Sequence, residues 1–592
     1  MSEFHFSPRS NRAHEIAWRP WGAQAFAEAK LADKPVLLSL SAVWCHWCHV
    51  MDETSYSDPG VIAAINAGFV PVRVDADQRP DINARYNAGG WPTTAFLTAD
   101  GEILTAQTYV APEGMRSIID IVLDAHRNKG DEIAAAISER QRRRAIAQTP
   151  PPGSNAVLPD VAVLETTKES IEEAYDEDFG GFGREPKFPH LDVLDFLALE
   201  FARTRNARLE RVLSSTLTAM ARGGMYDHIE GGFFRYSTTR DWSVPHFEKM
   251  AEDHAGFLRV YARAWKLLNL TPLRETLVSA IAYVRTTLRD PQTGLFAGSQ
   301  DADETYYALP LEERRGMQAP YIDRTSYTNW TAGLAGAFAI AGAALDDDQL
   351  VAESLQTLDT IATKLLDEDG LCFHFLEPGQ APKLRHQLTD QTSYLRALLD
   401  AYEVCGEPRL LARAGALAQS VRKAFTQSDG TLADHAAEES VGLLATGASP
   451  LPENAAVADA LLRLEVITQD GRYRESAERI LAAFVPRYGA LRTFAAPYAS
   501  AVARLLFGGT SVTIVGAPAA TAALREVARR LPDPLLVVAT LAPEDPQTAL
   551  RGLQLVEGRP TAYLCRGTLC GAPVTDAATL REAFDALHAT QS

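Results

Sequence analysis

The feature that most constrains the fold is a Cys-x-x-Cys motif, Cys45 to Cys48, between an apolar run and a helical segment. The apolar run, residues 35–40, predicts a buried strand, and residues 50–56 can continue a helix. At such a junction the unpaired amides and the dipole of the helix stabilise a thiolate on the first cysteine. The spacing therefore predicts that Cys45 is the exposed nucleophile and that Cys48, one turn later, closes a disulfide with it.

The segments that follow have the order of a thioredoxin-like fold. Residues 69–75 predict a second strand, residues 80–87 a short helix, and the β-rich run that follows Trp91-Pro92 a third strand. Thioredoxin-like folds place a cis-proline before that strand, facing the redox turn, so we expect a cis Trp91–Pro92 bond. Trp44, Trp91 and Pro92 are then expected to line a substrate groove beside the cysteines.

The Cys-x-x-Cys motif has three other interpretations. Cys45, Cys48 and His49 match the c-type haem attachment signature, but that maturation occurs outside the cytoplasm, and residues 1–6 show no export pattern. Zinc is disfavoured because His46 and His49 crowd one turn, which suits tetrahedral coordination poorly. A thioredoxin-like fold whose thiols have no physiological role is the third. Thiol chemistry without a cofactor or metal is the preferred interpretation.

Length and composition narrow the class of protein. A chain of 592 residues predicts two to four domains, and a net charge of −19 argues against nucleic acid as a partner. The longest apolar stretch, residues 333–345, is too short and too rich in glycine and alanine to span a bilayer. Six cysteines are few for a secreted protein, so we expect a cytoplasmic location without a membrane partner.

The pattern along the chain predicts a multidomain protein. We expect an α/β thioredoxin-like domain over residues 1–147, a proline-rich linker over 148–158 and a helical domain over 159–505. About a dozen helices, several followed by a similar acidic-glycine turn and with no convincing strand between them, predict an all-α (α/α)6 toroid of helical hairpins. Residues 506–592 predict a small α/β segment. Its Cys565 and Cys570 are interpreted as thiols at a strand end rather than as a second redox pair.

The loops of the helical domain hold the remaining unusual residues. Glycine-rich and aromatic segments there carry ionisable groups that suit a polar ligand such as a sugar. Two carboxylates would act as acid and base on a glycosidic bond, or histidines would move a proton beside a carbonyl. The alternative is that these residues tie the loops together by salt bridges. The expected binding residues are Asp227, His228, Arg235, His246, Glu248, Lys249, Asp301 and Asp303.

A family resemblance covers nearly the whole chain. Residues 44–51, Arg79-Pro80-Asp81 and Gly89-Gly90-Trp91-Pro92 resemble the family of spermatogenesis-associated protein 20, and the loop segments above match its characteristic blocks. The resemblance implies a thioredoxin-like domain followed by a helical domain like those of six-hairpin glycosidases and N-acylglucosamine 2-epimerases. It brings no defined reaction. The chain departs from the family at residues 308–324 and at His254, where asparagine is more usual.

These observations give three functional hypotheses. The leading one is thiol–disulfide oxidoreduction at Cys45 and Cys48, with the toroid binding the substrate, a protein thiol or a small molecule. The second is a sugar epimerase or glycosidase that uses the loop carboxylates and histidines, with the thioredoxin-like domain as a scaffold. The third is a non-catalytic binding module that uses both folds.

Overall fold

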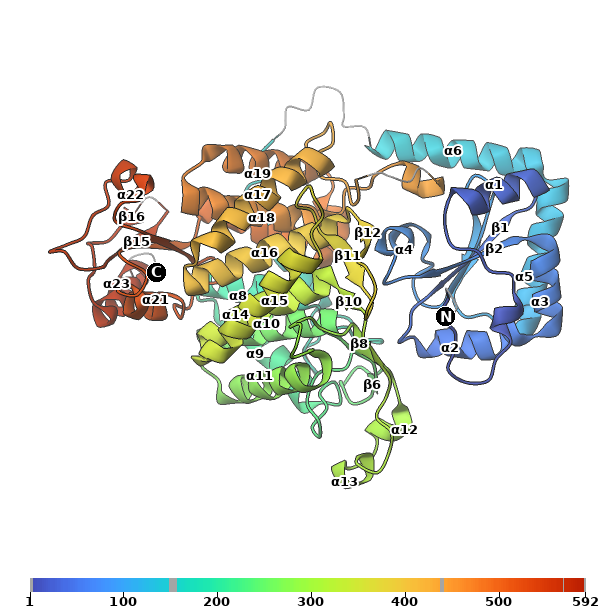
Figure 1. Ribbon diagram of the computed structural model, residues 1–592, viewed down its shortest axis with the longest axis horizontal. Helices are drawn as coiled ribbons and strands as arrows, with labels where there is room; N and C mark the ends of the chain where they lie inside the picture. The colour runs from blue at the N-terminus through green and yellow to red at the C-terminus, as the bar shows by residue number, and fades with distance from the viewer. Residues whose placement is uncertain (1–3, 149–156, 437–440, 568, 590–592) are drawn as a thin grey trace. The chain divides into compact units, whose positions relative to one another are not determined.

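The computed structural model describes residues 4–148, 157–436, 441–567 and 569–589 (Figure 1). The chain divides into two compact units. The first comprises Met1–Asn155 together with two later segments, Gln300–Ala302 and Asp434–Ala448, and the second comprises the rest. The linker predicted at 148–158 falls mostly on residues 149–156, which lie outside the described residues.

The described residues of the first unit form a four-stranded sheet in the order β2-β1-β3-β4. β1 and β2 are parallel, whereas β3 pairs antiparallel with both β1 and β4. All six side chains of β1 are buried, as a central strand covered on both faces requires. The strands are β1 (Val36–Ser41), β2 (Val70–Asp75), β3 (Thr93–Leu97) and β4 (Ile103–Gln107).

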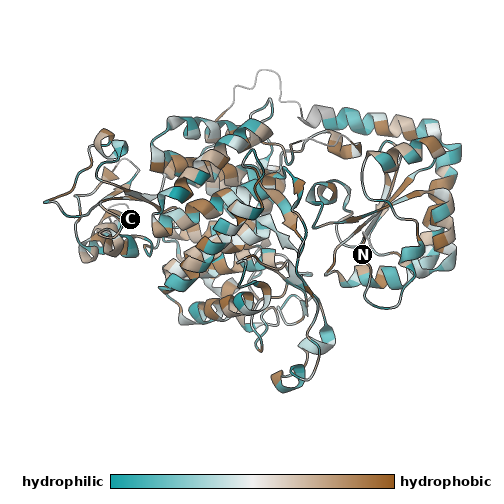
Figure 2. Cartoon of the chain, viewed as in Figure 1, coloured by the Kyte–Doolittle hydropathy of each residue, from teal (hydrophilic) through white to brown (hydrophobic). Residues whose placement is uncertain are grey.

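Helices cover both faces of this sheet. Tyr56, Ile65 and Ile119 pack with Leu37 and Phe96 in the core on one face. The helices are α1 (Ala23–Ala32), α2 (His46–Glu53), α3 (Pro59–Gly68), α4 (Pro80–Tyr86), α5 (Pro112–Asn128) and α6 (Gly130–Gln148). Figure 2 shows the strands as largely hydrophobic and α6 as largely hydrophilic. The prediction of a thioredoxin-like α/β domain is confirmed.

A segment from much later in the chain completes the core on the other face. The 3-10 turn Gly442–Ala445 contacts α4, and Leu444 packs with Phe26, Ile82 and Tyr86. The Tyr86 hydroxyl donates to the Gly101 carbonyl at 2.8 Å and accepts from the Leu443 amide at 2.8 Å. The first unit therefore has a fold that its N-terminal sequence alone does not complete.

Six helices of the described second unit form a closed inner ring. Each inner helix contacts the next inner helix along the chain. The last, α20, contacts the first, α8, which closes the ring. Their side chains are buried over most of their length, because neighbours surround them on nearly every side. The inner helices are α8 (Leu191–Thr204), α10 (Ala251–Leu268), α14 (Thr328–Leu345), α16 (Leu388–Cys405), α18 (Leu451–Thr468) and α20 (Ala496–Phe507).

An outer helix packs beside each inner one, which makes this domain the predicted (α/α)6 toroid. The outer helices are α7 (Ala162–Ala174), α9 (Ala207–Arg222), α11 (Thr271–Tyr283), α15 (Asp348–Lys364), α17 (Pro408–Phe425) and α19 (Gly471–Phe484). Every connection from an outer to an inner helix reaches the same end of the ring, the end that holds the N-termini of the inner helices. We call this end the mouth.

The long loops at the mouth contain short strands and helices that the sequence pattern did not predict. Backbone pairing between loops creates them, and periodicity does not signal such pairing. They are β5 (Tyr236–Ser237), β6 (Pro245–His246), β7 (Lys249–Met250), β8 (Ser299–Gln300), α12 (Glu304–Tyr307), α13 (Leu311–Arg314), β9 (Ile322–Asp323), β10 (Ser326–Tyr327), β11 (Phe373–Leu376) and β12 (Lys383–Arg385). The glycines of the acidic-glycine turns adopt the left-handed conformation that ends a helix, for example Gly294 with φ 74° and Gly370 with φ 74°.

The C-terminal segment repeats the sheet topology of the first unit. The order β14-β13-β15-β16, with β13 parallel to β14 and antiparallel to β15, has the same directions as β2-β1-β3-β4. Ala519 is the fourth residue after β13, as Cys45 is the fourth residue after β1. Its elements are β13 (Thr510–Val515), α21 (Ala522–Ala528), β14 (Val537–Leu541), α22 (Pro546–Leu550), β15 (Thr561–Arg566), β16 (Leu569–Cys570) and α23 (Ala577–Ala589).

Among the described residues, none of the helices combines the length and the apolar character that crossing a bilayer requires.

Candidate functional site

The Cys-x-x-Cys motif lies at the start of α2, directly after β1. Cys45 is the N-cap residue of α2, and the Cys48 amide donates to its Sγ at 3.1 Å. The two sulfurs are joined in a disulfide, with the Cα atoms 5.2 Å apart. The helix N-terminus thus directs an amide N–H at the first sulfur, where it stabilises negative charge.

The exposure of the sulfurs differs from the sequence-based expectation. Cys45 was expected to be exposed, but it is 3% exposed and Cys48 is 2% exposed. The sulfurs are bonded to each other at the first turn of α2, and the adjacent Trp44 is itself buried. Trp47, between the cysteines, is the large apolar side chain of this turn that reaches solvent, with 47% exposed.

The predicted groove residues surround this turn. The Trp91–Pro92 peptide bond is cis, which confirms the prediction. The rings of Trp44 and Trp91 meet edge to face with centroids 5.5 Å apart. Trp44 Nε1 donates to Asp77 at 2.6 Å, and Trp91 Nε1 donates to Asn83 at 3.2 Å. Both indoles therefore have fixed orientations beside the motif.

A buried ion pair and a neutral histidine lie behind the motif, and sequence reasoning missed both roles. Two guanidinium nitrogens of Arg73 on β2 donate to Asp52 on α2 at 2.9 Å each. His49, next to Cys48, keeps a buried Nε2 without a hydrogen-bond partner among the described residues. Burial, and then repulsion from His5, lowers the pKa of His49. Its imidazole is therefore neutral near pH 7.

In the second unit, two predicted pocket residues form part of a buried ion network. The Asp227 carboxylate accepts from Lys249 Nζ at 2.8 Å and from Arg314 at 2.8 Å, and all three side chains are buried. Burial lowers the pKa of Lys249 to about 8. Burial opposes ionisation of Asp227, but Lys249 and Arg314 outweigh it and lower the pKa of that carboxyl. These contacts join three loop segments of the mouth.

Three other predicted residues do not converge. His228 is exposed, and its Nε2 lies 3.1 Å from the Gly223 carbonyl oxygen. Asp303 caps α12 by accepting from the Tyr306 amide at 2.9 Å. Asp301 lies in Gln300–Ala302, which groups with the first unit, whereas Asp303 belongs to the second.

The remaining predicted residues meet at the N-terminus of α10. His246 Nδ1 is hydrogen-bonded to Glu248 Oε2, while Glu248 Oε1 is buried without a partner among the described residues. Asp253 Oδ2 is likewise buried and unpartnered there. Burial, which the charge of Arg235 offsets only in part, raises the pKa of Asp253 to about 7. A carboxyl with this pKa exchanges protons near neutral pH.

Two further acids belong to the same end of the ring. Glu252 on α10 and Asp192 on α8 are partly exposed, and desolvation by the protein around them is the largest cause that raises the pKa of each. A cavity of about 130 Å³ opens beside Asp192 between inner helices α8, α10, α14 and α16. Its wall includes Arg259 and Arg396, and Gly256 and Gly333 leave room at its side. The mouth thus combines acids of raised pKa with arginines around a polar cavity.

In the parts of the chain that the structure describes, no three His, Cys, Asp or Glu side chains come together in a group suited to a metal ion.

The geometry above can be compared with known proteins. Residues 7–144 match the family model described as "Thioredox_DsbH: Protein of unknown function, DUF255". The match lies within the N-terminal domain and covers the sheet, α2 with both cysteines, and the cis-proline.

Relatives extend the comparison beyond that domain. Spermatogenesis-associated protein 20 of Homo sapiens is 25% identical over 96% of this chain and 89% of its own length. The protein of the same name from Rattus norvegicus is 32% identical over 49% of this chain and 39% of its own length. The resemblance to the spermatogenesis-associated protein 20 family is confirmed over nearly the whole chain.

Solved structures resemble the helical part. Cellobiose 2-epimerase from Spirochaeta thermophila is 13% identical with a TM-score of 0.47, covering 60% of this chain and 97% of the epimerase. A GH76 α-mannanase from Bacteroides thetaiotaomicron is 13% identical with a TM-score of 0.45, covering 58% of this chain and 94% of the mannanase. These TM-scores are too low to support the fold assignment, which the contacts between the helices establish.

Proposed function

We propose that the N-terminal domain carries out thiol–disulfide exchange through Cys45 and Cys48. The observation that supports this most directly is the 3.1 Å hydrogen bond from the Cys48 amide to Cys45 Sγ at the N-terminus of α2. In the reduced protein the same amide and the helix dipole favour the thiolate of Cys45, which is the form that attacks a disulfide. The sparse cysteine content leads us to place this chemistry in the cytoplasm.

The proposed reaction transfers two electrons from the dithiol to a substrate disulfide. The Cys45 thiolate attacks one substrate sulfur, the substrate S–S bond breaks, and its second sulfur leaves as a thiolate. Cys48 then loses its proton and attacks Cys45 Sγ, which forms the Cys45–Cys48 disulfide and releases the second substrate thiol. Trp44, Trp91 and Pro92 are proposed to hold the substrate, and the exposed Trp47 joins them.

Trapping the mixed disulfide tests this assignment. Reduced Cys48→Ser protein, which also carries Cys565→Ser and Cys570→Ser, is mixed with oxidised glutathione, and intact mass reports the adduct. We expect Cys48→Ser to retain one glutathione at residue 45, and Cys45→Ser, the matched control, to form far less adduct. Equal amounts of adduct on both variants would contradict the proposal that Cys45 attacks first.

One observation supports a second function, at the mouth of the toroid. Asp253, with a pKa of about 7, and Glu248, with a buried unpartnered oxygen, lie together near Arg235 and His246. An acid that is half protonated at neutral pH next to a second carboxylate suits proton transfer on a polar ligand such as a sugar. We propose that Arg235, His246 and Glu248 bind the ligand and that Asp253 exchanges the proton.

Ligand-induced stabilisation tests the second function. Wild type and Asp253→Asn are screened by thermal unfolding against neutral mono- and disaccharides, with Asp303→Asn as the control carboxylate. A sugar that stabilises wild type and the control, but not Asp253→Asn, would support the proposal. A wild type that no sugar stabilises would contradict it.

A further inference from the structure

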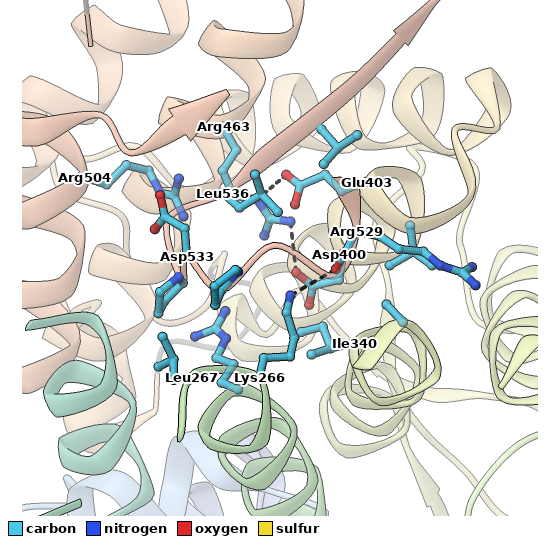
Figure 3. A pocket seen from close by; sticks show the side chains of 16 residues that line it. Lys266, Leu267, Ile340, Asp400, Glu403, Arg463, Arg504, Arg529, Asp533 and Leu536 are labelled. Atoms are coloured by element: carbon cyan, nitrogen blue, oxygen red, sulfur yellow. Dashed lines mark hydrogen bonds and ion pairs between the residues drawn. The ribbon is translucent and has the colours of Figure 1, made fainter. Parts of the chain in front are cut away.

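A second polar cavity lies at the opposite end of the ring from the mouth. It measures about 80 Å³ and is lined by the last turns of inner helices and by residues of the C-terminal segment between Arg529 and Val538. Figure 3 shows Arg504 and Arg463 with Asp533 and Leu536 of the C-terminal segment between them, and Lys266 below. The cavity therefore forms only where the toroid and the C-terminal segment meet.

The charges that line this cavity do not balance. Among the described lining residues five are cationic, namely Arg263, Lys266, Arg463, Arg504 and Arg529, and three are acidic, namely Asp400, Glu403 and Asp533. The excess of positive charge is unusual because the whole chain carries a net charge of −19. A local cationic cavity with apolar walls attracts anions.

The three acids already have partners. Asp400 accepts from Arg259 at 2.6 Å and from Arg463 at 2.9 Å, and Glu403 accepts from Arg463 at 3.0 Å. Two backbone amides of the C-terminal segment donate to the Asp533 carboxylate, at 3.0 and 2.8 Å. Asp400 and Glu403 are therefore paired with arginines, whereas Asp533 is held by backbone amides.

Several cations keep N–H donors to spare. Within the described chain, Lys266 Nζ donates to the Arg529 carbonyl at 3.0 Å, which uses one of its three N–H groups. Arg263 donates to Asp195 through a single nitrogen, and Arg504 spends two nitrogens on Asp459 and the Leu535 carbonyl. Arg529 does not contribute in this way. Figure 3 shows its guanidinium group pointing away from the other lining side chains, and its NH2 nitrogen lies 3.1 Å from Asp348.

The electrostatics of Lys266 favour an anion beside it. Burial, and then repulsion from Arg263, lowers the pKa of Lys266 to about 8. An anion in the cavity would face both side chains and relieve this repulsion.

We propose that this cavity binds inorganic phosphate, held by Lys266, Arg263 and Arg504. Phosphate is a compact oxyanion that accepts charge-assisted hydrogen bonds from both lysine and arginine. A volume of about 80 Å³ corresponds to roughly five to eight water-sized spheres, which leaves room for the five non-hydrogen atoms of phosphate. Bound there, phosphate would link the inner helices α10 and α20 and strengthen the attachment of the C-terminal segment.

The experiment measures phosphate binding to the full chain by isothermal titration calorimetry at constant ionic strength. Lys266→Met removes the ammonium and keeps the apolar stem. Lys364→Met, on the exposed face of outer helix α15, is the matched control, because it removes the same charge outside the cavity. We expect wild type and Lys364→Met to bind alike, and Lys266→Met to bind about tenfold more weakly or worse. A second arm titrates phenyl phosphate, which is expected to bind more weakly because its ring does not fit.

Three results would overturn the proposal. Wild type that binds no phosphate at millimolar concentration would show that the cations only neutralise the carbonyl ends of the inner helices. Equal binding by all three proteins would place the phosphate elsewhere. Phenyl phosphate that binds as tightly as phosphate would assign the site to a phosphate ester. The first and third results need only the wild-type protein, so they hold even if Lys266→Met does not fold.

Discussion

His254 offers the sharpest test of the packing at the mouth. Its ring is fully buried, its Nε2 accepts from the Phe233 amide at 2.9 Å, and its Nδ1 donates to the Met250 carbonyl at 2.7 Å. This arrangement requires the neutral ring, because a protonated Nε2 would face the Phe233 N–H. Burial lowers the pKa of His254 from 6.5 to about 4. Acid should therefore weaken the attachment of the loop to α10.

The magnitude follows from linkage between protonation and folding. Above pH 6.5 both folded and unfolded chains hold the neutral ring, so His254 adds no pH dependence. As the pH falls below 6.5, the unfolded chain binds the proton first, and the free energy of unfolding decreases. With pKa values of 6.5 and about 4, the loss is about 2 kcal/mol at pH 5 and about 3 kcal/mol at pH 4.

Urea unfolding followed by far-UV circular dichroism measures this effect, because most helices belong to the second unit. Wild type and His254→Gln are compared at pH 7 and pH 5. Glutamine keeps an acceptor and a donor but takes up no proton, and the other titrating groups are common to both proteins. We expect wild type to lose about 2 kcal/mol more than His254→Gln between these pH values. Equal losses in both proteins would refute the assignment of a buried neutral ring.

Three more predictions follow from the second unit. Asp227→Asn leaves the Lys249 ammonium buried without a full counter-charge, so we expect a loss of about 3–5 kcal/mol in urea unfolding; an unchanged midpoint would contradict this. Gly224→Ala would put its Cβ 2.1 Å from the Ser243 carbonyl oxygen, so we expect a loss of about 1–3 kcal/mol, and a stability equal to wild type would show that the loop moves freely. Asp253→Asn should remove one carboxyl that titrates near pH 7, as observed by carboxyl-carbon NMR, and a spectrum with no such resonance in wild type would exclude it.

The helices with a one-sided apolar pattern were predictable from sequence. The structure gives the outer helix α17 at Pro408–Phe425, as the pattern predicts. The inner helix α20, Ala496–Phe507, was missed because it is buried on nearly all sides and has little polar face to set a period. The topology of the C-terminal segment was also missed, because strand order depends on pairing between distant residues.

The residues of the candidate sites also divide into those that the sequence could predict and those that only the structure shows. Cys45, Cys48 and Pro92 could be found because a local motif fixes their geometry. Asp253 could not, because its raised pKa arises from burial and from the neighbouring charges of Glu252 and Glu248, which outweigh the opposing charge of Arg235. The residues Asp227 and Lys249 have the right types for a pocket, and only the structure shows that they bond to each other.

Cys565 and Cys570 show the limit of reasoning from spacing alone. The sequence interpretation gave two thiols at a strand end, because a gap of four residues is no standard redox spacing. In the structure they face each other across β15 and β16 and form a disulfide, with the Cα atoms 4.0 Å apart. This pair must therefore be removed before the redox chemistry of the first unit is measured.

The reduction potential of Cys45–Cys48 tests the central claim most directly. Full-length Cys565→Ser/Cys570→Ser protein is equilibrated in graded thiol–disulfide buffers, quenched with acid, alkylated under denaturing conditions and weighed by intact mass. The account predicts a reversible two-electron transition with a midpoint between about −270 and −120 mV, which is absent in the same protein carrying Cys45→Ser. A pair that no buffer oxidises, or a disulfide with a midpoint below about −300 mV, would contradict it.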